Sequence, residues 1–473
     1  MAKVKSIVWF RQDLRLSDNP ALRAGVAAGE ILPIFILDDE TAKNWKMGGA
    51  SRVWLHHSLL QLNASLNGKL SCYRGSAGDI IDDIVKRHRV AAVYWNRCYE
   101  PWRIKRDQEI KERLIDRAVL AKSFNGSLLW EPWEISKSDG TPYRVFTPFY
   151  RRGCLNAAAP RKPLARPRKI IADKDAQSVS VEELGLLPAQ KSWDEKIAKS
   201  WQFGEAAAGR VLDHFLNNGL GGYKGGRDIP SAPHVSRLSP YLHWGEISPN
   251  TVWHKARAIN DSVDVDHFCS EIGWREFSYA LLYHFPELPT QNFQPKFDAF
   301  QWIRNQKGLR AWQQGKTGIP IIDAGMRELW QTGYMHNRVR MIVASFLVKN
   351  LMVDWREGEK WFWDTLVDAD LANNSASWQW VAGSGADAAP YFRIFNPVTQ
   401  SEKFDPNGIY IHRYVPELSK LKGKALHAPW AASDEVLAAA GVSLGKTYPK
   451  PIADLKTTRV RALDAFKSLS GSN

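Results

Sequence analysis

Residues 323–404 decide the fold of the carboxyl-terminal half and read DAGMRELWQTGYMHNRVRMIVASFLVKNLMVDWREGEKWFWDTLVDADLANNSASWQWVAGSGADAAPYFRIFNPVTQSEKF. The apolar residues recur with a helical period. Six of the chain's 21 Trp residues lie here, and Trp312 stands just upstream. Ordinary cores are filled with Leu, Ile and Val, because each indole N–H needs a hydrogen-bond partner. The region therefore indicates flat aromatic ligands, stacked bases or electron transfer.

The bulk composition is that of a folded protein with a polyanionic partner. A chain of 473 residues is expected to form two or three domains. Its 44% hydrophobic and 24% charged residues are typical of a soluble globular protein. The net charge of +14 favours nucleic acid as a partner, although a generic basic enzyme fits the charge as well.

The cysteines and the amino terminus predict a reduced cytoplasmic protein. Cys72, Cys98, Cys154 and Cys269 form no C-x-x-C pair, and no His stands at zinc-finger spacing from them, so no structural metal is expected. The start MAKVKSIVWFRQDLR has no long apolar segment, and no run of about 18 apolar residues occurs. Neither secretion nor membrane insertion is expected.

The amino-terminal part alternates short apolar runs with helical patterns. The runs expected to be strands are residues 6–10, 31–37, 70–74, 90–95 and about 121–124, with helices over 51–66 and 77–87. Strands that are apolar on both faces suit a parallel sheet covered by helices, so a doubly wound α/β domain is expected. No G-x-G-x-x-G follows the first strand, which argues against a dinucleotide in the usual place.

The rest of the chain divides into a linker and a helical domain. Residues 130–195 are rich in Pro, Lys and Arg, as in PRKPLARPRK at 160–169, and show little periodicity. From about Ser200 to Ser468 the patterns are almost entirely helical. The predicted division is an α/β domain over 1–128, a linker over 129–199 and an all-helical domain over 200–473.

Two motifs suggest ligand contacts, each with a structural alternative. Ser236 and Ser239 stand where a helix would begin, so their hydroxyls and the backbone N–H groups could seat a phosphate; alone, an ordinary cap is favoured. Glu271, Trp274 and Arg275 share one helix face. They could line a polar cavity, but alone a core indole beside a salt bridge is favoured.

Two further motifs strengthen each other. Asn337, Arg340 and Met341 share a helical face and lead into the apolar run 341–351. The helix is therefore expected to carry Asn337, Arg338 and Arg340 into the interior, where Arg needs an anionic partner. Asp368 and Asp370 are the obvious candidates, and small residues at 372–377 would let a flat molecule approach the backbone. Together these motifs favour a ligand site over a structural ion pair.

The combined motifs resemble the DNA photolyase/cryptochrome family over nearly the whole chain. They are, in order, WFRQDLRLSDNPAL, SRLSPYL, WREF, KTGIPIIDAGMR, MHNRVRM, DWREGEKWF, DADLANN, WQW and DAAPYFRIFNP. The resemblance implies that residues 1–128 form an antenna domain and that residues 200–473 hold FAD in a folded, U-shaped form. The residues it assigns to FAD are Tyr223, Val235, Ser236, Arg237, Leu238, Ser239, Arg275, Arg340, Asp368, Ala369, Asp370 and Asn374.

The resemblance also implies roles within the FAD site. Arg340 would pair with Asp368. Asn374 would face flavin N5, where an amide can form a hydrogen bond but cannot deliver a proton, whereas a buried Asp could. Plant cryptochromes carry Asp at this place, so Asn374 favours a repair enzyme. Trp378, Trp355 and Trp302 match the family's electron-transfer chain from flavin to surface.

The damaged DNA would be held by residues on several helices. The resemblance assigns DNA binding to Glu271, Trp274, Asn337, Arg338, Trp380, Gln400 and Lys403, and catalysis to Glu271, Asn337, Met341 and Asn374. Photolyases for the (6-4) photoproduct carry His at the places of Asn337 and Met341. Cyclobutane pyrimidine dimers in UV-damaged DNA are therefore the expected substrate, split by an electron from photoexcited reduced FAD after flipping.

Three alternatives stay open: a cryptochrome-type photoreceptor, a (6-4) photolyase, and a helical nucleic-acid-binding protein without a cofactor. The antenna pigment is expected to be 5,10-methenyltetrahydrofolate, with a deazaflavin compatible. A monomer is expected. Two places depart from the family pattern: His234-Val235 opens the SRLSP run where relatives often carry Thr or Ser, and Gly273 replaces an expected apolar residue.

Overall fold

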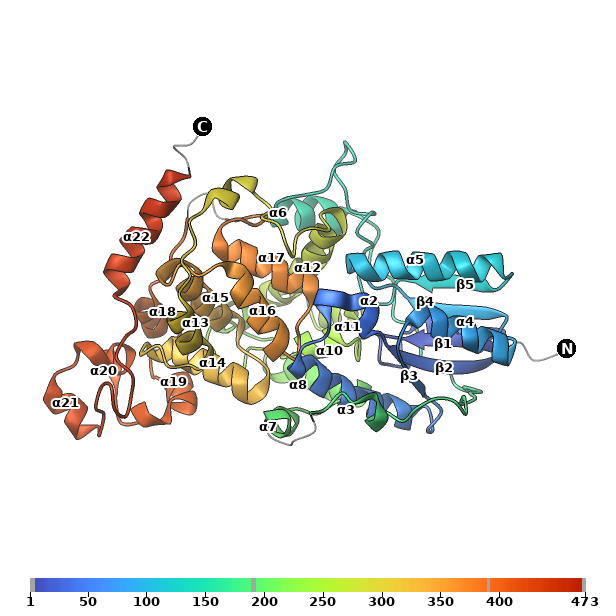
Figure 1. Ribbon diagram of the computed structural model, residues 1–473, viewed down its shortest axis with the longest axis horizontal. Helices are drawn as coiled ribbons and strands as arrows, with labels where there is room; N and C mark the ends of the chain where they lie inside the picture. The colour runs from blue at the N-terminus through green and yellow to red at the C-terminus, as the bar shows by residue number, and fades with distance from the viewer. Residues whose placement is uncertain (1–4, 189–192, 389–391, 470–473) are drawn as a thin grey trace. The chain divides into compact units, whose positions relative to one another are not determined.

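The computed structural model describes residues 5–188, 193–388 and 392–469. Contacts between residues divide it into two compact units. The first comprises Met1–Leu220, Ser236–Pro286 and Val367–Ala372, and the second comprises Gly221–Val235, Glu287–Leu366 and Asn373–Asn473. Figure 1 shows the chain from the amino to the carboxyl terminus.

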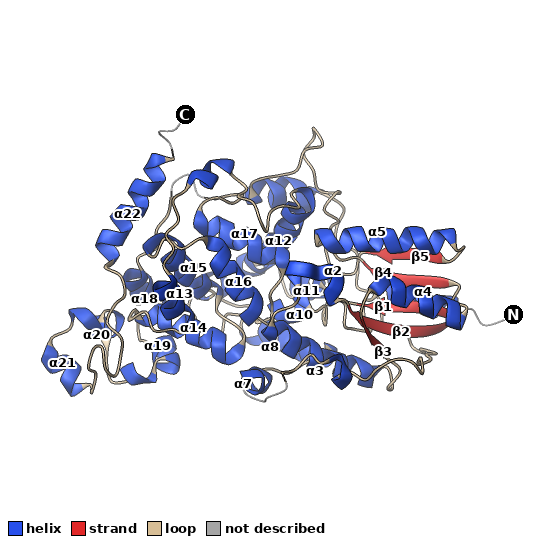
Figure 2. Ribbon diagram, in the orientation of Figure 1, coloured by secondary structure: helices blue, strands red, loops and turns tan. Residues whose placement is uncertain are grey.

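A five-stranded parallel sheet forms the base of the first unit, as predicted (Figure 2). Its strands are β1 (Lys5–Phe10), β2 (Glu30–Leu37), β3 (Ser71–Arg74), β4 (Ala92–Asn96) and β5 (Leu120–Phe124), in the order β3-β2-β1-β4-β5. The strand order reverses beside β1, because β1 pairs with both β2 and β4. This is a doubly wound topology whose switch point lies between β1 and β4.

Helices cover both faces of the sheet. They are α1 (Pro20–Ala28), α2 (Asp39–Ala42), α3 (Gly49–Ser65), α4 (Ala77–His88) and α5 (Pro101–Asp116). Ile81 and Leu114, from α4 and α5, share a core with Ile7 and Leu32 of the sheet. On the opposite face, α1 packs against β4. The apolar strands β1, β2 and β4 are therefore buried from both sides, as is typical of parallel sheets.

The segment after β5 is mostly irregular, as its lack of periodicity predicts. Its short turns are α6 (Phe146–Pro148), η2 (Phe149–Gly153), η3 (Cys154–Asn156), η4 (Glu182–Leu184) and α7 (Trp193–Lys199). Isolated bridges from Ile31 to Ala172 and from Cys72 to Val179 fasten it to the sheet. The three-part division of the chain stays a prediction.

The first unit also contains α8 (Glu205–Asn218), α10 (Ser239–His243), α11 (Pro249–Arg257) and the long α12 (Val263–His284). The unexpected Gly273 lies on α12 against the ring of Tyr150. A Cβ at this position would lie 2.5 Å from that ring. Glycine is therefore needed for close packing between α12 and the turn that carries Tyr150.

The second unit is helical. Its α-helices are α9 (Tyr223–Gly226), α13 (Gln306–Gln313), α14 (Pro320–Thr332), α15 (Asn337–Ser345), α16 (Trp355–Thr365), α17 (Leu371–Ala382), α18 (Pro397–Phe404), α19 (Ile409–Tyr414), α20 (Gly423–His427), α21 (Asp434–Ala439) and α22 (Leu455–Ser468). The turns η5 (Pro295–Ala299) and η6 (Phe346–Asn350) connect some of them, η6 being a π-helical turn that continues α15. Within residues 193–388 and 392–469 no strand occurs, as predicted. No helix in the described part of the chain is long and apolar enough to cross a membrane.

Candidate functional site

Helices α16 and α17 bring several of the predicted residues together. The indole of Trp378 on α17 lies directly against Gly358 of α16, where a Cβ would be only 2.1 Å from its ring. Gly358 stands three residues after Trp355 in the same helix, a rise of roughly 4.5 Å. Trp378 therefore packs one helical turn from Trp355, which suits the predicted electron-transfer role without testing it.

The three predicted electron-transfer residues differ in burial. Trp378 is buried against Trp312 and Phe362, with ring centroids 6.2 and 5.0 Å away. Trp355 is fully buried, and its Nε1 donates to Asn292 Oδ1 at 3.0 Å. Trp302 is partly exposed. Two indoles in the interior and one toward solvent match a route that ends at the surface.

Asn374 has a fixed amide orientation. It is buried, and its Nδ2 donates to the backbone oxygen of Glu359 at 3.0 Å. Among the described residues none bonds to Oδ1, so this oxygen is available as an acceptor. A flavin N–H is a suitable donor for it, and the chemistry at this position fits the cofactor that the sequence predicts.

Glu359 is a buried acid beside Asn374. Its side chain is 3% exposed and accepts a hydrogen bond from the hydroxyl of Ser375. Burial raises the pKa of Glu359 to about 8, more than the Ser375 hydrogen bond lowers it. The carboxyl is therefore protonated at neutral pH, and it adds no negative charge next to Asn374.

Asp368 and Asp370 belong to the first unit, where both are buried. The hydroxyl of Ser239 donates to Asp368 Oδ2 at 2.6 Å, and the hydroxyl of Tyr279 donates to Asp370. His243 Nδ1 lies 3.5 Å from Asp370. Burial acts to raise the pKa of Asp370, but His243 and the neighbouring donors outweigh it and hold that pKa below its usual range. Asp370 is therefore ionised.

Most of the other residues assigned to FAD lie in loops and at helix starts, whereas Arg275 lies within a long helix. Arg275 on α12 donates to Ser127 O at 2.8 Å and pairs with Glu276 at 3.1 Å. Tyr223 and Leu238 are buried, whereas Arg237 is exposed, adopts a φ of 51° and lies over the ring of Trp201. Ala369 is buried, and Val235 and Ser236 are half-buried. The role of this set in holding FAD, and the pairing of Arg340 with Asp368, stay predictions.

The predicted DNA-contacting residues of the first unit lie together on α12. Glu271 and Trp274 are half-buried. The ring of Trp274 stacks on Phe146, with centroids 3.8 Å apart, so one of its faces is already covered. Glu271 lies 3.9 Å from His267, one turn earlier. The shared helix face that the spacing predicts is confirmed, and its contact with DNA stays a prediction.

The second unit corrects one expectation about α15. Asn337 is exposed, and Arg338 and Arg340 are half-buried, although an interior position was expected. The reason is that α15 buries the face formed by Val339, Ile342 and Val343 and leaves the face of Asn337 and Met341 outward. Arg338 pairs with Asp228 at 2.6 Å. This exposure suits contact with a large ligand better than an interior ion pair does.

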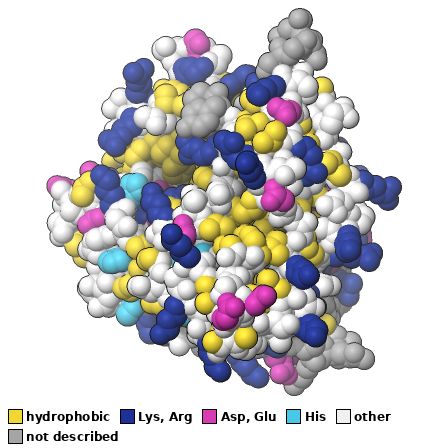
Figure 3. All heavy atoms as spheres, turned by 90° about the vertical axis from the view of Figure 1, so that its left-hand side faces the viewer, with side chains coloured by type: hydrophobic (Ala, Val, Ile, Leu, Met, Phe, Trp, Pro, Cys, Tyr) yellow, Lys and Arg dark blue, Asp and Glu magenta, His cyan; other side chains and the backbone are white. Residues whose placement is uncertain are grey.

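The remaining predicted residues lie near the carboxyl side of the second unit. Trp380 on α17 is half-buried, and its Nε1 donates to Asp387 O at 3.1 Å. Gln400 and Lys403 lie on α18, half-buried and exposed respectively. Figure 3 shows one face of the molecule, on which Lys and Arg outnumber Asp and Glu and hydrophobic side chains lie in a hollow. Such a surface suits a polyanion.

Sequence reasoning missed Gly358, Glu359 and Lys349 as functional candidates. Glu359 had a signal, because it follows Trp355 by four residues and therefore shares its helix face. Lys349 had another signal, because it interrupts the apolar run 341–351. Among the residues that the structure describes, no group of three His, Cys, Asp or Glu side chains could hold a metal ion.

Comparison with known families covers most of the chain. The profile described as "DNA photolyase" matches residues 6–168. The profile described as "FAD binding domain of DNA photolyase" matches residues 268–468.

Several named proteins are similar over nearly the whole of this chain. A deoxyribodipyrimidine photo-lyase of Agrobacterium fabrum is 48% identical and covers 98% of this chain, which covers 98% of that protein. Cryptochrome-1 of Arabidopsis thaliana is 37% identical, with 98% of this chain and 70% of that protein covered. The crystal structure of a bacterial class III photolyase from Agrobacterium tumefaciens matches with a TM-score of 0.95 and 47% identity, covering 100% of this chain and 99% of that one.

Proposed function

The chain belongs to the DNA photolyase family, and we propose that it is a light-dependent enzyme that repairs cyclobutane pyrimidine dimers in DNA. The observation that carries the proposal is Asn374, whose buried amide donates from Nδ2 to Glu359 O and has its Oδ1 available to a ligand. An amide cannot protonate a reduced flavin, whereas the Asp of plant cryptochromes could. The similarity to cryptochromes keeps a photoreceptor as the second candidate.

FAD, when bound in its reduced form and excited by light, supplies the electron that splits the dimer. Asp370, held ionised by His243 and Tyr279, would orient the ring system by accepting its N–H groups. Asn374 would accept a further N–H through Oδ1. Because Glu359 is protonated, it would add no negative charge beside Asn374.

The dimer would be held by residues of several helices. Trp274 and Trp380 offer aromatic faces for the damaged bases, and Glu271 and Asn337 offer polar atoms for the base edges. Asn337 and Met341 lie outward on α15, where a flipped nucleotide could reach them. Arg338, Gln400 and Lys403 would contact phosphates, and this contribution is expected to weaken with salt.

An antenna pigment, if bound, is expected away from the switch point of the sheet. Ligands of open α/β sheets usually bind outside the carboxyl ends of the strands at this point. Here the crevice beside β1 and β4 is filled by side chains: Arg11 pairs with Asp107 and donates to Asn96 O, and Asn96 donates to Asp13. The hollow next to Cys98 and Tyr99 measures only about 10 Å³. The proposed pigment is 5,10-methenyltetrahydrofolate rather than a deazaflavin, and it would bind elsewhere on this domain.

UV-damaged DNA as partner, a monomeric state, a cytoplasmic location and independence from metal ions and membranes remain part of this proposal. The direct test is repair. The protein is reduced anaerobically, mixed with UV-irradiated oligo-dT and illuminated with blue light, and the absorbance of thymine near 260 nm is followed. Recovery that needs light supports the proposal. If photoreducible FAD is bound and the absorbance does not recover, the photoreceptor or (6-4) alternative gains support instead.

A further inference from the structure

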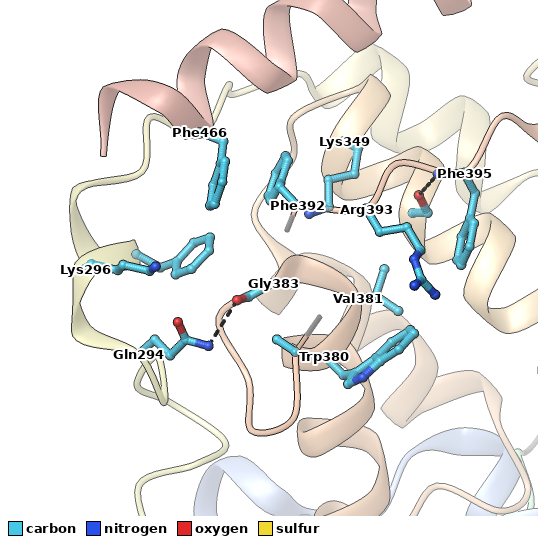
Figure 4. A pocket seen from close by; sticks show the side chains of 13 residues that line it. Gln294, Lys296, Lys349, Trp380, Val381, Gly383, Phe392, Arg393, Phe395 and Phe466 are labelled. Atoms are coloured by element: carbon cyan, nitrogen blue, oxygen red, sulfur yellow. Dashed lines mark hydrogen bonds between the residues drawn. The ribbon is translucent and has the colours of Figure 1, made fainter. Parts of the chain in front are cut away.

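A recess in the second unit lies outside the residues assigned to FAD, and Trp380 is its only predicted DNA-contacting residue (Figure 4). Its volume is about 200 Å³, several times the roughly 30 Å³ occupied by one water molecule. The end of α17, the π-helical turn η6, the turn η5 and helix α22 contribute to its walls.

Lys349 lies in this wall as a buried amine, and no acidic residue in the described part of the chain pairs with it. It is 1% exposed, and its Nζ donates to Ala382 O at 2.8 Å. The same Nζ lies 3.0 Å from the ring centroid of Phe392. Burial holds the pKa of Lys349 well below its ordinary value. A buried charge is normally paired, so an amine with one carbonyl and one ring as partners leaves an opening for an anion, whose binding would favour the ammonium form.

The remaining lining adds positive charge and flat apolar surface. Lys296 and Arg393 also line the recess, and none of its described lining residues is Asp or Glu. Phe392 and Phe466 stack with centroids 4.6 Å apart and an interplanar angle of 7°. Figure 4 shows Lys349 beside Phe392, with Phe466 on the far side of that ring and Arg393 nearby. The recess therefore combines an anion-attracting end with an aromatic wall.

The local backbone also supports a binding role. Lys349 is placed by η6, and π-helical turns inside helices are rare and occur frequently at functional sites. Gly383 lies opposite, and a Cβ there would be 3.6 Å from Lys349 Nζ and 3.2 Å from Phe392. Glycine at this place keeps the space beside the ammonium open.

We propose that this recess is a nucleotide subsite in which Lys349 binds a phosphate group and the Phe392–Phe466 wall contacts the base. The nucleotide could be free or part of a DNA strand, because both present the same phosphate and ring. Apart from Trp380, the residues that line the subsite are not among those expected to hold the dimer, so nucleotide binding there can be measured separately from the repair reaction.

The test compares Lys349→Met with Lys420→Met in the FAD-loaded full chain. Lys420 is an exposed lysine of the same unit, so its replacement is the same substitution made at the surface instead of in the recess. Binding of dAMP, inorganic phosphate and an undamaged single-stranded oligonucleotide is measured by titration calorimetry at low salt. Lys349→Met is expected to weaken nucleotide binding at least about tenfold, because a charge-assisted hydrogen bond is lost. Lys420→Met is expected to change it little.

The pattern of losses identifies the source of the phosphate. Loss of dAMP binding indicates a free nucleotide, and loss confined to the oligonucleotide indicates a DNA strand. Phe466→Leu is expected to weaken dAMP binding without changing phosphate binding. Equal binding by the wild type and Lys349→Met, or equal losses in both lysine variants, would overturn the proposal.

Thermal unfolding separates this role from a structural one. A lone buried ammonium costs stability, so Lys349→Met is expected to melt at the same or a higher temperature. A lower melting temperature combined with unchanged nucleotide binding would make Lys349 a structural brace and refute the subsite.

Discussion

The carboxyl edge of the parallel sheet and the helices of the second unit bury ionisable groups in opposite ways. At the sheet edge, Arg11 pairs with Asp107, and Arg106 contacts both Asp107 and Asp38. In the second unit, Lys349 and Glu359 are at most 3% exposed, and neither forms an ion pair with a described residue. The first arrangement closes a crevice, and the second leaves groups that respond to protons or ligands.

The difference follows from the free energy of desolvation. A buried pair regains through mutual attraction much of what each ion loses on leaving water, but removing one partner leaves the other ion uncompensated. A buried ion without a partner instead shifts its pKa toward the neutral form. Paired charges thus hold a crevice closed, whereas unpaired buried groups can respond to a proton or a ligand.

The largest effect is expected from breaking the pairing at the sheet edge. Asp107→Asn leaves Arg11 and Arg106 without this carboxylate, and the free energy of unfolding is expected to fall by about 3–5 kcal/mol. Urea unfolding of the full chain, followed by far-UV circular dichroism, measures it. Asp116→Asn, at an exposed position on the same helix, is the control and is expected to change stability by less than about 0.5 kcal/mol. Equal midpoints for both variants would show that the pairs contribute nothing.

The second largest effect is expected from pH, which changes the protonation of Glu359 and therefore its contribution to stability. The pKa of Glu359 rises from an ordinary 4.5 to about 8 in the folded chain, so folding favours the protonated form. Its contribution to stability is full below pH 4.5 and is lost as the pH rises through 8, at roughly 1.4 kcal/mol for each unit of pKa difference. Glu359→Gln keeps a neutral side chain at every pH.

The measurement is the difference in melting temperature between wild type and Glu359→Gln from pH 6 to pH 9. Glu246 and Glu276 also have pKa values raised to about 7 by burial, but they titrate equally in both proteins. The variant is expected to gain relative stability as the pH rises, whereas Glu357→Gln, at an exposed position on α16, is not. Parallel curves for wild type and Glu359→Gln would mean that Glu359 is ionised in the fold.

A smaller effect on stability is expected at the contact between the Trp378 indole and Gly358. Gly358→Ala places a methyl group 2.1 Å from the present position of the Trp378 ring, so the ring must move. We expect a loss of about 1–3 kcal/mol from overpacking, together with slower photoreduction of bound FAD. Gly209→Ala is the matched control, because nothing lies within 4 Å of its added Cβ on α8. It is expected to stabilise the chain by up to about 1 kcal/mol. A Gly358→Ala protein as stable and as readily photoreduced as wild type would contradict the tight contact.

These two regions also differ in how well the sequence predicts them. The strands are apolar runs bounded by turn residues, so a local pattern is sufficient, and the parallel order follows from the intervening helices. The contact between Gly358 and Trp378, or between Gly273 and Tyr150, joins residues that no local pattern relates. Asn337 was expected inside because the apolar run follows it, but the periodicity of α15 turns it outward.

The same reason explains why the unpaired groups were missed. Lys349 and Glu359 are ordinary residues in helical sequence, and only the packing around them shows that neither forms an ion pair with a described residue. The ion pairs at the sheet edge were also not predicted, since Arg11 and Asp107 are far apart in the chain. Family resemblance, rather than pattern, assigned the residues of the FAD and DNA sites.

The two regions also surround their tryptophans differently. Replacing a tryptophan of the second unit is expected to give the smallest change in stability. Trp9 at the sheet edge lies beneath the guanidinium groups of Arg11 and Arg106, at 4.5 and 4.8 Å, and nearby positive charge opposes removal of an electron from the indole. Trp378 instead packs against rings and a glycine. An electron route is therefore expected through the helical unit and not through Trp9.

Trp302→Phe tests the surface end of that route. Trp302 is partly exposed, and a phenyl ring can still pack on Phe300, so stability is expected to change by about 0.5 kcal/mol or less. Phe is much harder to oxidise, so photoreduction of bound FAD by an external reductant, followed by its absorbance under blue light, is expected to slow several-fold or more. Trp133→Phe, at an indole 46% exposed in the first unit, is the control and is expected to leave the rate unchanged. If Trp302→Phe is photoreduced at the wild-type rate, electrons leave the interior by another residue, and the difference between the two regions does not extend to electron transfer.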